Sequence, residues 1–166
     1  MHKTGHVGAA LLAFGPIGFV AGAIGGAEVV LLAGGVAAGL ASVPDVDTQV
    51  PFVPHRGPTH TVWFAALVGI GVAFGGFLVG LQTGVLVGIA LGVLGAITGT
   101  VAIASHLAAD ALTPMGIRPF TPWCERHYTW DLVSAANPIA NYALLGLGGA
   151  VGIGLSMGGV WLHQAV

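Results

Sequence analysis

Histidine and aspartate gather at four points of a chain that otherwise avoids polar side chains. His106 and Asp110 are four positions apart, and on a helix this spacing puts both side chains on one face, where they can reach one metal ion. The sequence PDVD at residues 44–47 offers two carboxylates, which converge if this segment is extended. The densest polar segment is HRGPTH at residues 55–60, and His6 lies near the start of the chain. These residue types predict a metal site.

Seven side chains are candidate metal ligands, four imidazoles and three carboxylates. This mixture suits zinc, manganese or iron, and we expect zinc. Seven exceeds the three or four ligands that one catalytic zinc takes from a protein. Either two ions bind, or one ion binds and some of these residues orient its ligands. The candidates are His6, Asp45, Asp47, His55, His60, His106 and Asp110.

Three residues are candidates for catalysis if the site hydrolyses an ester. A metal ion lowers the pKa of water towards 7 and polarises the scissile group. Asp45 or Asp47, whichever is not a ligand, would then act as the general base. Arg56 lies between two of the histidines, and its planar guanidinium can bind a phosphate or stabilise negative charge. An Arg beside a membrane also serves as a topology anchor or a contact to lipid headgroups, and this alternative stays open.

The composition around these residues is that of a membrane protein. Of the 166 residues, 55% are hydrophobic and only 6% are charged, which excludes a water-soluble globule. The net charge is −2, with four Lys and Arg in all, so no basic surface is available for nucleic acid. The single cysteine, Cys124, excludes an intrachain disulfide.

Stretches without Asp, Glu, Lys, Arg or His predict the elements that position the site. About 20 apolar residues cross a bilayer, so the longest stretch must hold two crossings, which we expect to turn at Gln82-Thr83. The first two stretches form another pair, turning at Gly25-Gly26, and the second of them is short for a full crossing. The last stretch predicts a fifth helix, capped by Asn137. The stretches are Val7–Ala27, Val29–Pro44, Thr61–Ser105 and Leu132–Leu162.

We therefore expect an all-α fold, a polytopic membrane helix bundle of about five transmembrane helices in a single integral membrane domain over residues 1–166. Five crossings place residues 1–6 and the loops 44–60 and 113–131 on one side. All four Lys and Arg, six of the seven His and five of the six carboxylates lie there. The excess of Lys and Arg predicts that this side, with the N-terminus, is the cytoplasmic side of the inner or plasma membrane. The polar site should then lie at that membrane surface.

The order of these motifs resembles a known family. Thr4-Gly5-His6, the PDVD and HRGPTH segments and the pattern His106-x3-Asp110-x2-Thr113-x2-Gly116 together look like the predicted membrane-bound metal-dependent hydrolases grouped with a LexA-regulated inner-membrane protein of bacteria. The resemblance runs from residue 4 to about residue 120. It implies a multi-pass membrane protein whose His and Asp residues bind metal and which belongs to a group named as hydrolases.

Position at the membrane surface favours membrane lipids as partners and an amphiphilic phosphoester, such as a phospholipid or an isoprenoid phosphate ester, as substrate. Two alternatives stay open. Intramembrane His and Asp also mark the pathways of metal-ion or proton transporters, although a carrier should have polar residues near the midplane. A non-catalytic scaffold stabilised by metal fits the same sequence. The oligomeric state is not predicted.

Overall fold

The computed structural model describes residues 1–166, and its regular structure is entirely helical. Four helices are long and apolar enough to cross a membrane, which confirms the predicted all-α membrane fold. Two short 3-10 helices, η1 and η2, lie between α1 and α2. In chain order the elements are α1 (Lys3–Leu40), η1 (Pro44–Gln49), η2 (Pro58–His60), α2 (Val62–Leu81), α3 (Val85–Ala111) and α4 (Pro138–Gln164).

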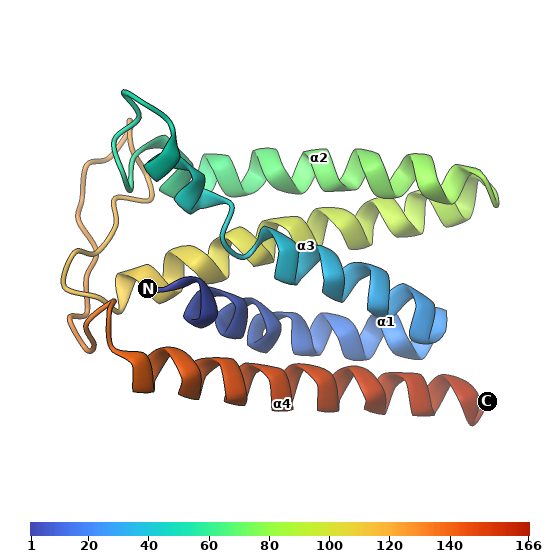
Figure 1. Ribbon diagram of the computed structural model, residues 1–166. Coiled ribbons are helices and arrows are strands. Elements are labelled where there is room, and N and C mark those ends of the chain that lie inside the picture. Colours follow the sequence, from blue (N-terminus) through green and yellow to red (C-terminus); the bar gives the residue numbers. More distant parts are fainter.

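α1 is a helical hairpin and not one straight helix. The backbone at Gly26 has φ 71° and ψ −165°, a left-handed conformation that favours glycine, and the chain reverses there (Figure 1). Phe14 of the first arm packs against Ala33 and Ala37 of the second arm. The bundle therefore has five helical segments, as predicted. The second arm, residues 27–40, rises about 21 Å, less than the roughly 30 Å of a bilayer core.

The other hairpin also turns where it was expected. α2 ends at Leu81, α3 starts at Val85, and the amide of Thr83 donates to the carbonyl of Gly80 at 3.0 Å. Asn137 caps α4, because its side chain accepts a hydrogen bond from the amide of Ala140.

Residues 44–47 do not meet the condition under which their two carboxylates would converge. They are not extended but form the 3-10 helix η1, and Asp45 and Asp47 point to different neighbours. Pro58 fits the first turn of the long helix that follows it in the sequence, but in the structure it starts η2. Thr61 is the N-cap of α2, where its side chain accepts a hydrogen bond from the amide of Phe64.

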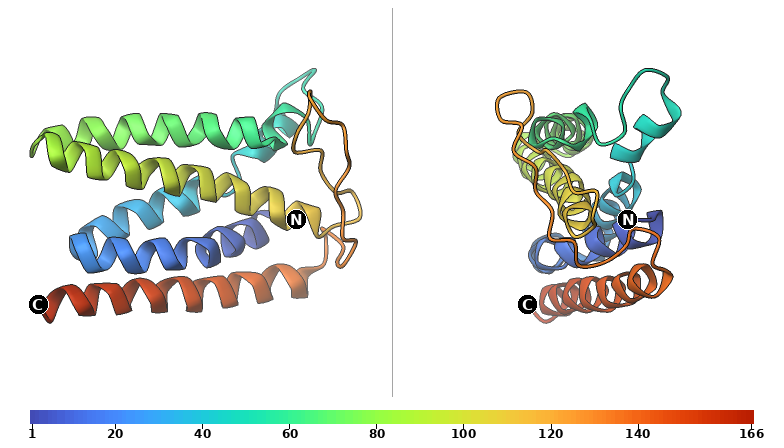
Figure 2. Two further views of the ribbon diagram at one scale, coloured as in Figure 1. Left: turned by 180° about the vertical axis from the view of Figure 1, so that it is seen from behind. Right: turned by 90° about the vertical axis from the view of Figure 1, so that its left-hand side faces the viewer.

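Glycines set how closely the helices approach. α4 lies along the first arm of α1, and α2 lies along α3 (Figures 1 and 2). A Cβ atom at Gly8 would overlap the α4 backbone at Leu144, and one at Gly148 would overlap the α1 backbone at Gly8. Such close approach requires the absence of a side chain.

Both long loops lie at one end of the bundle together with the N-terminus, and the C-terminus lies at the other end (Figure 1). The loop after α3 is fastened to that helix, because the amide of Trp130 donates to the carbonyl of Ala111 at 2.8 Å. The amide of Leu132 likewise donates to the carbonyl of Leu112 at 2.9 Å. One end of the bundle thus collects the polar segments.

Candidate metal centre

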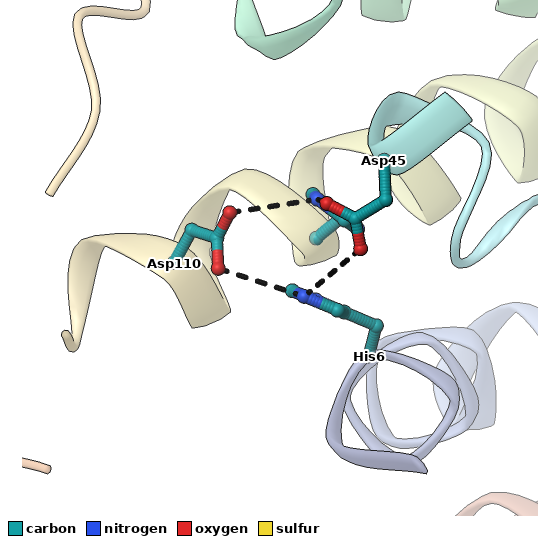
Figure 3. A group of neighbouring side chains, drawn as sticks. His6, Asp45 and Asp110 are labelled. Carbon is teal, nitrogen blue, oxygen red and sulfur yellow. Dashed lines mark ion pairs between the residues drawn. The ribbon is translucent and has the colours of Figure 1, made fainter. Parts of the chain in front are cut away.

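Four elements bring the candidate ligands together at this end. α1 supplies His6, η1 supplies Asp45, η2 supplies His60, and the last two turns of α3 supply His106 and Asp110. Figure 3 shows His6, Asp45 and Asp110 pointing toward one another from three of these elements. The i, i+4 spacing on α3 puts its two side chains on one face, as predicted.

The Nε2 atoms of three histidines meet two carboxylates. His60 Nε2 lies 3.6 Å from Asp45 Oδ1 and 3.4 Å from Asp110 Oδ2. His106 Nε2 lies 3.5 Å and 3.6 Å from the same two oxygens, and 3.2 Å from His60 Nε2. His6 Nε2 is 3.7 Å from Asp45 Oδ2 and 3.5 Å from Asp110 Oδ1. Separations of this size are those between ligand atoms that share one ion at about 2.0 to 2.2 Å.

The far ring nitrogens of two histidines are held by acceptors. His106 Nδ1 donates to the carbonyl oxygen of Ala41 at 2.7 Å, and His60 Nδ1 faces Asp47 Oδ2 at 3.2 Å. A proton on Nδ1 leaves the lone pair of Nε2 pointing into the cluster. Such outer partners fix the tautomer and raise the basicity of a metal-binding histidine.

Asp47 is buried and surrounded by donors. Its Oδ1 accepts from His55 Nδ1 at 2.9 Å, and its Oδ2 accepts from the Thr59 hydroxyl at 2.9 Å and the Arg56 amide at 3.1 Å. His60 also faces Oδ2. The carboxylate therefore ties together the whole segment from residue 55 to residue 60.

Arg56 lies against Asp110, and its side chain is only 8% exposed. Nη2 donates to Asp110 Oδ1 at 2.9 Å, and Nη1 donates to the Gly116 carbonyl at 2.7 Å and the Thr113 hydroxyl at 3.1 Å. Only Nε has no partner. This guanidinium fastens Asp110 to the loop that follows α3.

The residues fit a divalent cation. Asp110 Oδ2 is buried and accepts no hydrogen bond, although Nε2 of His60 and Nε2 of His106 lie 3.4 Å and 3.6 Å from it. The α-amino group of Met1 contacts Asp110 Oδ1, so positive charge already faces this carboxylate. Two carboxylates and three imidazoles are a donor set that suits zinc, manganese or iron. The Nε2 lone pairs of His60 and His106 face inward, whereas His6 Nε2 lies 3.0 Å from the carbonyl oxygen of Met1 and donates to it, so His6 would have to give up this bond to bind an ion.

Electrostatics at the loop residues agree with this fit. Burial alone would raise the pKa of Asp47, but hydrogen bonds from His55 and Thr59 hold it below its usual range. Burial also opposes ionisation of Asp45, yet its contacts with His106 and His60 keep its pKa low. Burial would lower the pKa of His60, whereas the facing carboxylates of Asp110 and Asp45 raise it. The site therefore favours the ionised forms of Asp45 and Asp47.

The structure brings all seven predicted ligands into one region, six of them in two groups that share Asp45. Five donors surround the centre itself, and His55 forms a neighbouring group with Asp45 and His60 whose ligand atoms lie within 4.8 Å of one another. Asp47 lies one step further out, bonded to His55 and facing His60. Sequence reasoning missed the Ala41 carbonyl and Thr59, since neither a backbone oxygen nor a lone threonine carries a sequence signal.

No curated protein and no solved structure matches this chain. One family model matches it over residues 1–165, that of the YdjM inner membrane protein. The match covers nearly the whole chain and includes every candidate metal ligand. The chain therefore belongs to the YdjM inner membrane protein family.

Proposed function

We propose that the protein is a membrane-embedded metal-dependent hydrolase that acts on a phosphoester or lipid-like substrate at the cytoplasmic membrane surface. The observation that carries the proposal is the convergence of three histidine Nε2 atoms and two carboxylates at one end of the bundle. The inner-membrane protein family that the sequence motifs resemble is grouped with predicted metal-dependent hydrolases, and this supports the same assignment.

His6, His60, His106, Asp45 and Asp110 would hold the ion, with zinc as the first candidate. When bound, a divalent cation polarises the phosphoester and lowers the pKa of water towards 7. The side chain of Asp45 is 29% exposed, whereas those of the other four donors are buried. Substrate therefore approaches from the side of Asp45.

His55 is the proposed proton-transfer residue. Its Nδ1 donates to the buried Asp47 carboxylate, and its ring is 39% exposed. A carboxylate in this position orients the imidazole and fixes its tautomer. The other ring nitrogen can take a proton from the attacking water and return it to the departing alcohol, while the water oxygen bonds to phosphorus and the ester P–O bond breaks.

Asp45 is the alternative general base, as the sequence predicts. For Asp47 and Arg56 we now propose positioning roles. The oxygens of Asp47 accept three hydrogen bonds, and the Arg56 guanidinium is committed to Asp110, Thr113 and Gly116.

The test is a screen of metal-loaded protein in detergent against phospholipids, isoprenoid phosphates and soluble phosphoesters. His55→Gln should keep its metal content and lower turnover by about 10²-fold or more. Asp45→Asn should lower both the metal content and the turnover if Asp45 is a ligand. His163→Gln is the control, since His163 is an exposed histidine in the last turn of α4, at the opposite end of the bundle and outside the cluster. Metal-loaded protein without hydrolysis of any of these esters would favour the scaffold or, with uptake into proteoliposomes, the transporter.

A further inference from the structure

A cleft of about 1010 Å³ opens beside the metal centre. Three segments form it: residues 54–58, the start of α2, and the loop from residue 115 to residue 127. Backbone contacts fix these walls. The amide of Val62 donates to the carbonyl of Pro119 at 2.9 Å, and the loop closes on itself through a bridge between Ile117 and Tyr128. The cleft is therefore a built feature of this end of the bundle.

Cationic side chains outnumber acidic ones around the cleft. Two of the four Lys and Arg of the chain, Arg56 and Arg118, line it together with His55 and His127, against the single carboxylate of Glu125. Arg56 is already occupied by Asp110. Arg118 is exposed and forms no ion pair, so its guanidinium is available for an anionic ligand.

The opposite wall is apolar and continues along a membrane helix. Trp63 and Leu67 are four residues apart on α2, hence on one face, and both are exposed. Trp63 stacks edge-to-face on Trp123 of the loop, with ring centroids 4.7 Å apart. Trp residues favour the membrane interface because they join an apolar ring to a polar N–H group. This wall suits the first part of an alkyl chain below a headgroup.

The cleft reaches the metal centre through His55. This residue lines the cleft, is bonded to Asp47, and lies with Asp45 and His60 in a group whose ligand atoms are within 4.8 Å. The cleft thus shares His55 with the group that contains Asp45, the most exposed of the five donors of the centre.

We infer that this cleft binds a phosphate-bearing membrane amphiphile, with Arg118 contacting the phosphate and the Trp63–Trp123 pair contacting the start of its chain. Presentation of the ester to the metal centre rests on the proposed function, whereas binding does not. The occupant is a lipid and not free phosphate, because the apolar wall of the cleft follows the lipid-facing side of α2.

Native mass spectrometry of the full chain in maltoside micelles tests the phosphate contact, with phosphatidic acid as the probe. Arg118→Gln should weaken binding about tenfold, as expected for loss of a charge-assisted contact. Arg126→Gln is the matched control, because Arg126 belongs to the same loop but lies over the Tyr128 ring, 5.3 Å from its centroid, outside the cleft. Equal weakening by both variants, or by neither, would overturn the assignment of Arg118.

A second comparison tests the chain contact and the identity of the ligand. Trp63→Ala should weaken phosphatidic acid binding, whereas Trp130→Ala, at an exposed loop tryptophan outside the cleft, should not. Phosphatidylcholine with the same chains and glycerol 3-phosphate should each bind at least about tenfold more weakly than phosphatidic acid. Equal binding of glycerol 3-phosphate would make the cleft a site for soluble phosphates, and equal binding of phosphatidylcholine would remove its preference for anions.

Both readouts measure binding and not turnover. Failure to hydrolyse a bound phosphatidic acid would therefore count against the proposed hydrolase and leave the cleft assignment standing. Hydrolysis that is unaffected by Arg118→Gln and Trp63→Ala would support the proposed hydrolase and count against the cleft as its binding site.

Discussion

His106 Nδ1 donates a hydrogen bond of 2.7 Å to the carbonyl oxygen of Ala41, a residue 65 positions earlier in the chain. The bond exists because α1 folds back at Gly26 and returns its second arm to the end of α3. It joins the helical hairpin to the candidate metal centre and leaves Nε2 of His106 facing the two carboxylates. The fold-back of α1 and the chemistry of the site are therefore linked.

The first prediction concerns metal content. Replacing both His106 and Asp110 with Ala should strip the purified protein of its transition metal, because two of the five converging donors are lost. Elemental analysis measures the outcome, and His127→Ala serves as the control. Equal metal content in the double variant and the wild type would disprove the ligand assignment, provided that circular dichroism shows both to be folded.

The second prediction concerns Asp47. Asp47→Asn should keep the fold but lower metal affinity about 10- to 100-fold, because the amide no longer offers a charged acceptor to His60 and His55. Competition with a chelator measures affinity, and Asp131→Asn in the exposed loop is the control. An unchanged affinity would mean that Asp47 does not act through these histidines.

The third prediction concerns topology. In a Cys124→Ser background, Val50→Cys and Phe120→Cys should react with a membrane-impermeant maleimide only after cells are opened, and Gln164→Cys should react in intact cells. Val50 and Phe120 are exposed at the loop end, and Gln164 ends α4 at the opposite end. Labelling of positions 50 and 120 in intact cells would show the opposite orientation. Labelling of these two positions from opposite sides of the membrane would contradict their placement at one end of the bundle.

The fourth prediction concerns packing. Gly148→Ala should destabilise the protein by about 1 to 3 kcal/mol, because its new methyl group would overlap the backbone of Gly8. Gly149→Ala is a neighbouring control with open space around the added atom. Thermal unfolding in detergent compares them. If both variants unfold alike, the close contact of α1 with α4 does not set stability.

The sequence alone was sufficient for the overall architecture and for naming the candidate ligands that lie at one end of the bundle. Apolar stretches in a chain with 6% charged residues have to form membrane helices, since lipid offers no partner to an unpaired backbone group. The reversal at Gly25-Gly26, the turn at Gln82-Thr83 and the shared face of His106 and Asp110 follow from local rules of the same kind. His and Asp residues are costly beside a membrane, and this made them recognisable as candidates.

Only the tertiary structure decided how those residues divide their roles. Asp45 and Asp47 differ by two positions, yet the 3-10 turn of η1 directs Asp45 to the imidazoles of His6, His60 and His106 and buries Asp47 behind His60. The pairing of Arg56 with Asp110 likewise joins residues 54 positions apart. Such contacts depend on which segments the packed helices bring to one end of the bundle. Residue spacing within a single segment therefore cannot predict them.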